Sequence, residues 1–279
     1  MRWERGRRSS NVSDRRGAKA AGGLGLGGIA IVLIGWFLGI DPRAILGFVD
    51  GMPGGSSTTS QPRGQNSKPQ DEIGDFISVM LASNEDVWQE QFKKHNLRRY
   101  QTPRLEIFSQ ATRSACGAAS SASGPFYCPG DQTIYIDPSF INDMKRMGAP
   151  GDFAFAYVIA HEYGHHVSYL TGVLGEAHRV MQRSDKARAN QISVRLELQA
   201  DCYAGVWAAN LQKYNIQLEA GDIEEGLKAA RAVGDDRLMA SAGQSIRPEN
   251  FTHGTSAQRM EWFEKGLKGR DMSVCDTFR

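Results

Sequence analysis

The sequence predicts an α+β fold that is mostly helical, contains a small sheet and is preceded by one N-terminal transmembrane helix. Three observations lead to this prediction: an uncharged run of 21 residues near the N-terminus, several long segments without proline, and one short run of alternating polar and apolar β-formers. The chain has 279 residues, of which 41% are hydrophobic and 23% charged. This composition is typical of a folded protein with one sizeable domain.

The first 40 residues combine a basic segment with an apolar one. Residues 1–19 carry seven arginine and lysine residues against two acids, and residues 20–40 are long enough to span the roughly 30 Å core of a bilayer as a helix. Basic residues on the N-terminal side favour a cytoplasmic position for that end. We therefore expect a single-pass protein of the cell inner membrane, with the rest of the chain on the periplasmic side. A cleaved secretory signal, a buried core helix and a nucleic-acid-binding arm are the alternatives, and we expect no nucleic-acid partner.

The four cysteines all follow the apolar segment. An even number of cysteines outside the cytoplasm suggests disulfides, and no pair has the spacing of a zinc knuckle. Cys116 and Cys128 enclose a stretch rich in Gly and Ser that suits a local loop, which leaves Cys202 to pair with Cys275. Four cysteines allow three connectivities, and buried free thiols are the alternative.

Residues 41–71 are expected to form a flexible linker, because Gly, Ser, Thr, Pro, Gln and Asn dominate the chain from residue 51 onward. The folded domain is then expected over residues 72–279. Its first helix is predicted over residues 73–94, and the alternation at residues 133–137 predicts a short strand. Further helices are predicted at about residues 152–172, at about 185–214, from residue 221, and at about 256–267.

A histidine–glutamate motif lies in the helix predicted after residue 152. His161 and His165 are four residues apart, so their imidazoles share one helix face, about 40° apart, and can bind a single ion. Zinc accepts nitrogen ligands and keeps a position for water when the protein supplies three ligands. Glu162 is placed to act as general base on that water. His166 points about 100° away from His165 and is expected to support the site or to lie on the surface.

The third metal ligand is predicted to be Glu197. Ser168 and Thr171 occupy the positions at which one branch of the zinc peptidases has glycine and a third histidine, so that branch is excluded. Glu197 and Asp201 lie one turn apart on the helix predicted at 185–214. Asp201 is expected to accept the free N–H of a ligating histidine. The competing glutamates are Glu176, Glu219, Glu224 and Glu225.

Peptide hydrolysis also needs a positive or hydrogen-bonding group beside the metal. His253, in a loop that contains glycine, is the first candidate, and Tyr203 and Arg259 are the others. A purely structural role for His253 is the alternative. The strand at residues 133–137 is the candidate edge for pairing with an extended substrate, and an ordinary structural strand is the alternative.

Several segments together resemble the bacterial neutral zinc metallopeptidase family. They are HEYGHH at residues 161–166, ELQADCYAGVW at 197–207, THGTS at 252–256, GPFYCP at 124–129, and the N-terminal MRW and DRR. The resemblance covers nearly the whole chain apart from the linker. It implies a gluzincin-type, zincin-like fold, bound Zn²⁺ and an association with the membrane, and it names no substrate.

The function predicted from these residues is that of a membrane-anchored zinc metalloendopeptidase. Zn²⁺ held by His161, His165 and Glu197 would activate water for the hydrolysis of a peptide or protein substrate, with Glu162 as general base. The alternative is a catalytically silent, zinc-stabilised module that binds envelope proteins. Glu162 favours the enzyme, because a structural zinc site gains little from a general base.

Overall fold

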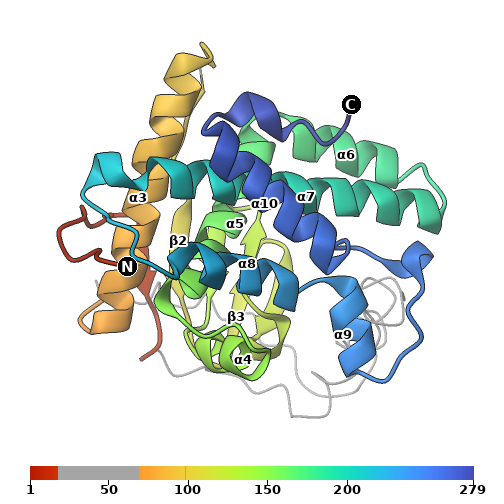
Figure 1. Ribbon diagram of the computed structural model, residues 1–279, viewed down its shortest axis with the longest axis horizontal. Coiled ribbons are helices and arrows are strands. Elements are labelled where there is room, and N and C mark those ends of the chain that lie inside the picture. The colour runs from red at the N-terminus through yellow and green to blue at the C-terminus, as the bar shows by residue number, and fades with distance from the viewer. Residues whose placement is uncertain (18–68, 98) are drawn as a thin grey trace, which may run out of the picture.

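The computed structural model describes residues 1–17, 69–97 and 99–279 (Figure 1). The transmembrane helix expected at residues 20–40 lies outside the described residues, as does the linker expected at 41–71 up to residue 68. Within the described ranges, none of the helices combines the length and the apolar character needed to cross a membrane.

The long helices expected from the sequence are present, within a few residues of their predicted ends. They are α3 (Glu72–Lys94), α5 (Asp152–Leu170), α7 (Lys186–Asn210), α8 (Asp222–Ala232) and α10 (Ser256–Gly269). A 3-10 turn at Leu211–Tyr214 continues α7, so helical backbone reaches the predicted residue 214. The shorter helices, which the sequence analysis did not predict, are α4 (Phe140–Arg146), α6 (Val173–Met181) and α9 (Asp235–Ser241), with 3-10 turns at Ser121–Ser123, Pro248–Asn250 and Met272–Cys275.

A mixed sheet has the strand order β1-β2-β6-β5. Its strands are β1 (Val12–Asp14), β2 (Arg104–Ile107), β6 (Thr133–Ile136) and β5 (Phe126–Cys128), and a separate hairpin joins β3 (Ala111–Ser114) to β4 (Gly117–Ser120). β1, β2 and β6 are parallel neighbours, whereas β5 is antiparallel to β6.

The strand predicted at residues 133–137 is confirmed as β6, but the expectation that it offers a free edge is wrong. β6 is paired on both sides, with β2 and with β5, and all four of its residues are buried. Its neighbours have only three or four residues, which is too short for a clear alternation in the sequence. The outer strand on this side of the sheet is therefore β5.

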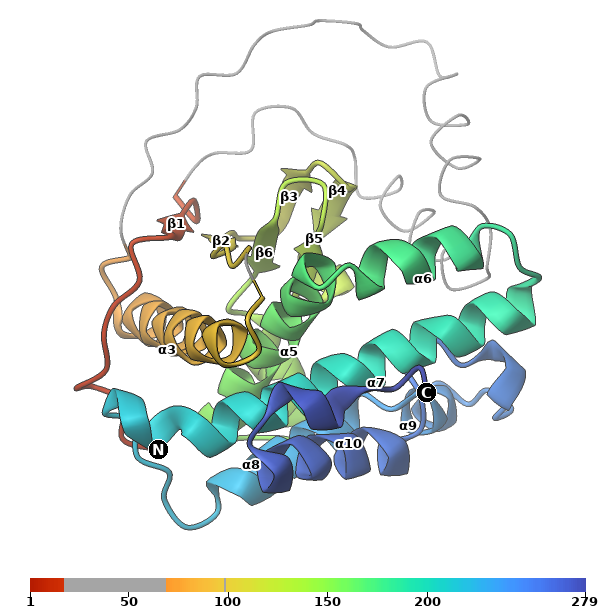
Figure 2. The same cartoon turned by 90° about the horizontal axis from the view of Figure 1, so that it is seen from above.

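The helices form layers on one side of this sheet (Figure 2). α3 and α5 lie next to the sheet, α7 crosses α5, and α8 and α10 lie beyond. Large buried side chains fill the space between the layers, including Trp88 of α3 and Trp207 of α7. α5 is thus enclosed by sheet and helices, which explains why nearly all of its residues are buried.

Helices α5 and α7 approach closely at Gly164, inside the histidine motif. A Cβ atom there would lie 2.9 Å from the Cα of Ala200, closer than real side chains come. The glycine costs the helix about 1 kcal/mol, and it allows the close backbone contact between α5 and α7. The helices are antiparallel, since Tyr157 bonds to Asp201 whereas His165 lies against Glu197.

The N-terminal residues belong to the folded domain. β1 pairs with β2 over Val12–Asp14, and Arg2 exchanges two backbone hydrogen bonds with Gln217, at 2.9 and 3.0 Å. From the sequence, residues 1–19 are instead expected to form a separate basic cytoplasmic segment, with the domain beginning at residue 72. The three-residue strand β1 has no periodicity that could have revealed it.

Both disulfides expected from the sequence are present. Cys116 is bonded to Cys128 and Cys202 to Cys275. The first closes the loop that leads into β5, and the second fixes the C-terminal turn to α7. The second begins at the residue that follows Asp201, so it secures the part of α7 that faces the histidine motif.

Candidate metal centre and active site

The structure brings together the three predicted metal ligands. His161 and His165 project from α5 and Glu197 from α7, and their ligand atoms all lie within 4.8 Å of one another. The Nε2 atom of His161 lies 3.1 Å from Glu197 Oε2, and that of His165 lies 3.4 Å from Oε1. Both imidazoles therefore present Nε2 to the same carboxylate.

These distances fit a tetrahedral zinc ion. With bonds of about 2.0–2.1 Å, two ligand atoms of a tetrahedral site are about 3.3 Å apart, close to the observed 3.1 and 3.4 Å. Two nitrogens and one carboxylate also form the donor set of catalytic zinc sites, which keep one position open. The residues present thus suit Zn²⁺ in number, chemistry and spacing.

A buried hydrogen-bond network fixes the orientation of His161. Its Nδ1 atom lies 2.8 Å from Asp201 Oδ1, as predicted. Asp201 is completely buried and also accepts one hydrogen bond from the Tyr157 hydroxyl and two from the guanidinium of Arg259, those from Arg259 at 2.8 and 2.9 Å. Because the carboxylate holds Nδ1–H, the Nε2 atom of His161 is left free to bind the metal.

The two ligating histidines have opposite proton affinities. Burial lowers the pKa of His165 to about 4, so this imidazole is neutral. Burial also disfavours the charged form of His161, but the Asp201 and Glu197 carboxylates outweigh it and raise its pKa to about 10. A positive charge between His161 and Glu197 is therefore favourable. Either a proton or a metal ion can supply it.

Glu162 lies buried beside the metal ligands. Burial raises its pKa to about 7, although the neighbouring His161 and a hydrogen bond from the backbone N–H of Tyr127 favour its charged form. Tyr127 is the central residue of β5, so this bond connects the proposed base to the outer strand of the sheet. A carboxyl group with a pKa near neutrality is suited to accepting a proton and giving it up again.

His253 lies near Glu197, as the sequence analysis required of a group beside the metal. The two side chains shift one another's pKa through their charges. His253 Nδ1 lies 3.2 Å from Asp235 Oδ1. Burial lowers the pKa of His253, but the hydrogen bond to Asp235 and the charge of Glu197 raise it above its ordinary value.

The other candidates from the sequence lie elsewhere or have other partners. Tyr203 is buried in the core against Trp88, with ring centroids 4.9 Å apart, and so does not reach the metal centre. The guanidinium of Arg259 is bound by Asp201 rather than directed at a substrate. The competing glutamates are placed away from the metal ligands: Glu176 pairs with Arg179, Glu219 with Arg2, and Glu225 accepts from the N–H of Phe153.

His166 is neither a ligand nor a surface residue. It is fully buried, its Nε2 atom donates to the carbonyl of Gln101, and its Nδ1 atom therefore accepts from the Tyr127 hydroxyl. Burial lowers its pKa to about 4. His166 thus fixes β5 to the metal-binding helix.

Sequence reasoning missed three groups that shape the site. Tyr157 lies one turn before His161 on the same face of α5, so its spacing could have indicated it. Asp235 and the backbone N–H of Tyr127 are far from the motif in the chain. No local pattern marks them, and only the fold brings them to the site.

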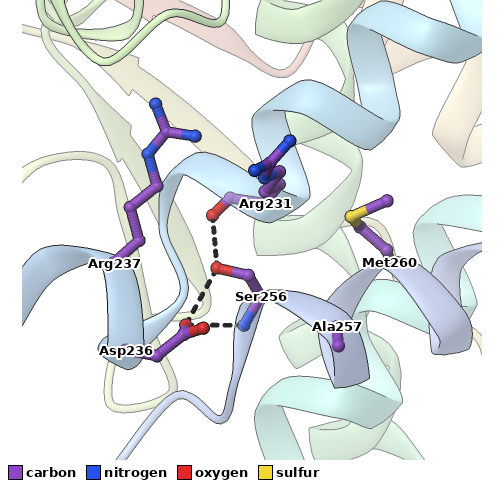
Figure 3. Close-up of a pocket in the computed structure, with 6 residues that line it drawn as sticks. All are labelled: Arg231, Asp236, Arg237, Ser256, Ala257 and Met260. Carbon is purple, nitrogen blue, oxygen red and sulfur yellow. Dashed lines mark hydrogen bonds between the residues drawn. The ribbon is translucent and has the colours of Figure 1, made fainter. Parts of the chain in front are cut away.

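A surface cavity of about 530 Å³ lies beside the His253 loop (Figure 3). Its lining comes from α8, α9 and α10, and includes none of the metal-binding residues. Ser256 donates its N–H and its hydroxyl to Asp236, each at 2.8 Å, and the hydroxyl also bonds to the carbonyl of Arg231. These bonds fix the end of the loop that carries His253.

Comparisons with known proteins agree with this geometry. The family described as "Putative neutral zinc metallopeptidase" matches residues 1–278. The chain is similar to the Escherichia coli K12 protein called Uncharacterized protein YpfJ, with 44% identity over 293 positions that cover 100% of this chain and 99% of the relative. It is also similar to Mycobacterium bovis Uncharacterized protein Mb2605 and Mycobacterium tuberculosis Uncharacterized protein Rv2575, each 45% identical over 64% of this chain and 63% of the relative. No solved structure matches. The chain therefore belongs to the "Putative neutral zinc metallopeptidase" family.

Proposed function

We propose that this protein is a zinc-dependent peptidase that hydrolyses peptide bonds in extended polypeptide segments. The observation that carries the proposal is the position of Glu162, buried directly beside three ligands whose spacing fits tetrahedral zinc. A purely structural zinc site has four protein ligands and no need of a neighbouring base. A site with three ligands and a base is arranged for hydrolysis.

The residues of the chain then have distinct roles in the reaction. Zinc bound by His161, His165 and Glu197 would supply a Lewis acid and lower the pKa of water. Glu162 accepts a proton from the attacking water and delivers it to the nitrogen of the leaving amine. His253 donates a hydrogen bond to the carbonyl oxygen of the scissile peptide as that oxygen gains negative charge.

The substrate is proposed to pair with the outer strand β5. The backbone N–H of Tyr127 in β5 lowers the pKa of Glu162, which places this strand beside the carboxylate, and no described strand pairs with the side of β5 away from β6. An extended peptide that adds to this edge would place its backbone beside Glu162. Backbone pairing gives little sequence preference, and the stacked rings of Phe126 and Tyr135, 4.9 Å apart, offer an apolar surface for a side chain.

We propose that the domain acts outside the cytoplasm, as the sequence analysis expected. The support is chemical: both disulfides join cysteines that have no metal-binding role, and such structural disulfides persist in oxidising compartments. The substrates would then be envelope or secreted polypeptides.

The test compares the full chain with its Glu162→Gln variant. Each protein is loaded with zinc, its zinc content is measured, and it is incubated with an unfolded protein such as reduced, alkylated casein. We expect equal zinc in both and cleavage by the unmodified chain only. The variant keeps the size of the side chain and its bond from Tyr127, so folding is preserved.

Glu224→Gln is the matched control, because Glu224 lies on α8, outside the metal centre. It should cleave at the rate of the unmodified chain. Equal zinc without cleavage by the unmodified chain would favour the non-catalytic binding module instead. Cleavage by the Glu162→Gln variant at the unmodified rate would exclude Glu162 as the base.

A further inference from the structure

We propose that residues 1–17, named here the N-terminal strap, are a permanent part of the catalytic domain and lie on the same side of any membrane as residues 69–279. Figure 2 shows the strap running along one side of the molecule, from the N-terminus near α7 and α8, past α3, to β1 at the sheet. Contacts at its start, middle and end fix it to the domain.

The start of the strap is bound at the first turn of the metal-binding helix. The ammonium group of Met1 lies 3.2 Å from Asp152 of α5 and 3.2 Å from Asp222 of α8. Next to it, Arg2 and Gln217 form an antiparallel bridge with a hydrogen bond in each direction. The strap thus connects the helix that carries the histidine motif to α8.

The middle of the strap packs tightly against α3. A Cβ atom on Gly6 would lie 2.5 Å from Val79 Cγ1, so only glycine allows this approach. The buried carboxylate of Glu85 accepts hydrogen bonds from three strap residues: Arg7 at 2.8 Å, Ser9 at 2.6 Å and Asn11 at 2.7 Å. Detachment of the strap would leave this carboxylate without these donors, which is unfavourable for a buried charge.

The end of the strap meets the chain again where the domain resumes. The guanidinium of Arg16 binds both carboxylate oxygens of Asp71, at 2.7 and 2.8 Å. Asp71 is the N-cap of α3 and accepts from the N–H of Gly74. The two residues lie on either side of residues 18–68, so the chain leaves the domain and returns to it at one place.

The arginines of the strap have another role than the one expected from the sequence. Basic residues beside an apolar segment normally favour a cytoplasmic position. Here five of the strap arginines form ion pairs with carboxylates of residues 69–279. The pairs are Arg2 with Glu219, Arg7 with Glu85, Arg8 with Asp75, Arg15 with Glu106 and Arg16 with Asp71. A single crossing at residues 20–40 would separate every one of these pairs by about 30 Å of hydrocarbon.

This topology differs from the one expected from the sequence, in which the N-terminus is cytoplasmic and the domain lies outside the cytoplasm. A chain segment that begins and ends on one domain crosses a bilayer an even number of times, or never. The strap and the catalytic domain therefore share one compartment. This inference does not depend on catalysis, since every contact that carries it lies outside the metal centre.

The test is a cross-link in living cells between Arg2→Cys and Gln217→Cys in the full chain. Residues of a hydrogen-bonded antiparallel pair have Cα atoms about 5.5 Å apart, within the usual range for disulfides. Cells are treated with a membrane-permeant oxidant and free thiols are blocked with N-ethylmaleimide before lysis. The peptide that joins positions 2 and 217 is then measured by mass spectrometry.

The control combines Arg2→Cys with Ser184→Cys, because residue 184 precedes the start of α7 and residue 217 follows its end. α7 is about 37 Å long. We expect the 2–217 cross-link in most molecules and the 2–184 cross-link in almost none. If the 2–217 cross-link forms in the purified, zinc-loaded protein but not in cells, the proposal is overturned. A pair that joins in neither, while zinc content is normal, would also overturn it.

Discussion

The candidate active site contains two aspartate–histidine pairs of different construction. In the Asp201–His161 pair both side chains are buried, with exposed fractions of 0% and 8%. In the Asp235–His253 pair the aspartate is nearly buried, whereas the histidine is 39% exposed. The same two residue types thus form one enclosed pair and one that opens to solvent.

The two aspartates are also held differently. Asp201, on α7, is held by side chains of two other helices: His161 and Tyr157 of α5 and Arg259 of α10. Asp235 is held by the loop it supports, and its Oδ2 atom accepts from three consecutive backbone N–H groups, at residues 252, 253 and 254. The first pair is fixed by helix packing and the second by a short loop.

This difference suggests a division of labour. Asp201 holds Nδ1 of His161 so that Nε2 faces Glu197, which builds a lasting metal ligand. Asp235 holds Nδ1 of His253 and raises its pKa, so that the exposed imidazole keeps a proton that it can offer to a substrate. Three predictions test whether the first pair serves the metal and the second serves the reaction.

The largest effect is expected from removal of the ligand that faces both histidines. Glu197→Gln should lose zinc almost completely on dialysis, because the amide is neutral and a poor zinc ligand. Zinc content per chain, measured by atomic emission, gives the result. Glu176→Gln, on the exposed surface of α6, is the control and should keep one zinc. Stoichiometric zinc in Glu197→Gln would refute the ligand assignment.

An intermediate effect is expected when the aspartate of each aspartate–histidine pair is replaced by asparagine. Asp201→Asn should weaken zinc binding by about 10- to 100-fold, as loss of a partner behind a ligating histidine does. Asp235→Asn should change zinc affinity by less than about twofold, since His253 is not a ligand. Competition with a chelator of known affinity measures both values. Equal losses in the two variants would show that the pairs do not differ in function.

The smallest effect concerns the pH dependence of cleavage. In the proposed mechanism His253 acts in its protonated form, and its pKa is raised, so the rate should fall as pH rises through that pKa. In Asp235→Asn the pKa of His253 should move back down, and the fall should begin at lower pH. In His253→Gln the fall in rate at high pH should disappear. Its kcat should be about 100-fold lower at neutral pH. If the fall in rate at high pH is unchanged in both variants, another group causes it.

Local patterns were sufficient for the metal-binding helix and for the long helices around it. The spacing of His161 and His165 places both imidazoles on one face whatever surrounds the helix. The same holds for Glu197 and Asp201, one turn apart on α7. The ends of the long helices were also predictable to within a few residues, and the helix predicted from about residue 152 begins there, with Gly151 as its N-cap.

The sheet could not be predicted to the same extent. β1, β2 and β5 have three or four residues each, so neither their periodicity nor their order was visible. Because the strand order could not be predicted, the position of β6 between two neighbours could not be predicted either. The basic N-terminus was interpreted from its charge and from the apolar run that follows it, because nothing in residues 1–17 shows which carboxylates they will meet.

The sequence by itself determined the candidate chemistry of the centre: two histidines, the proposed base between them, and a glutamate with its supporting aspartate; for the cysteines it favoured one of three possible pairings. Those depend on spacing along one helix, or on a small number of possible combinations. Only the tertiary structure decided that Arg259 binds Asp201, that Asp235 supports His253, that β5 is an outer strand of the described sheet and that the strap joins the domain. These are contacts between residues far apart in the chain, and they exist only because packing of the helices and the sheet brings them together.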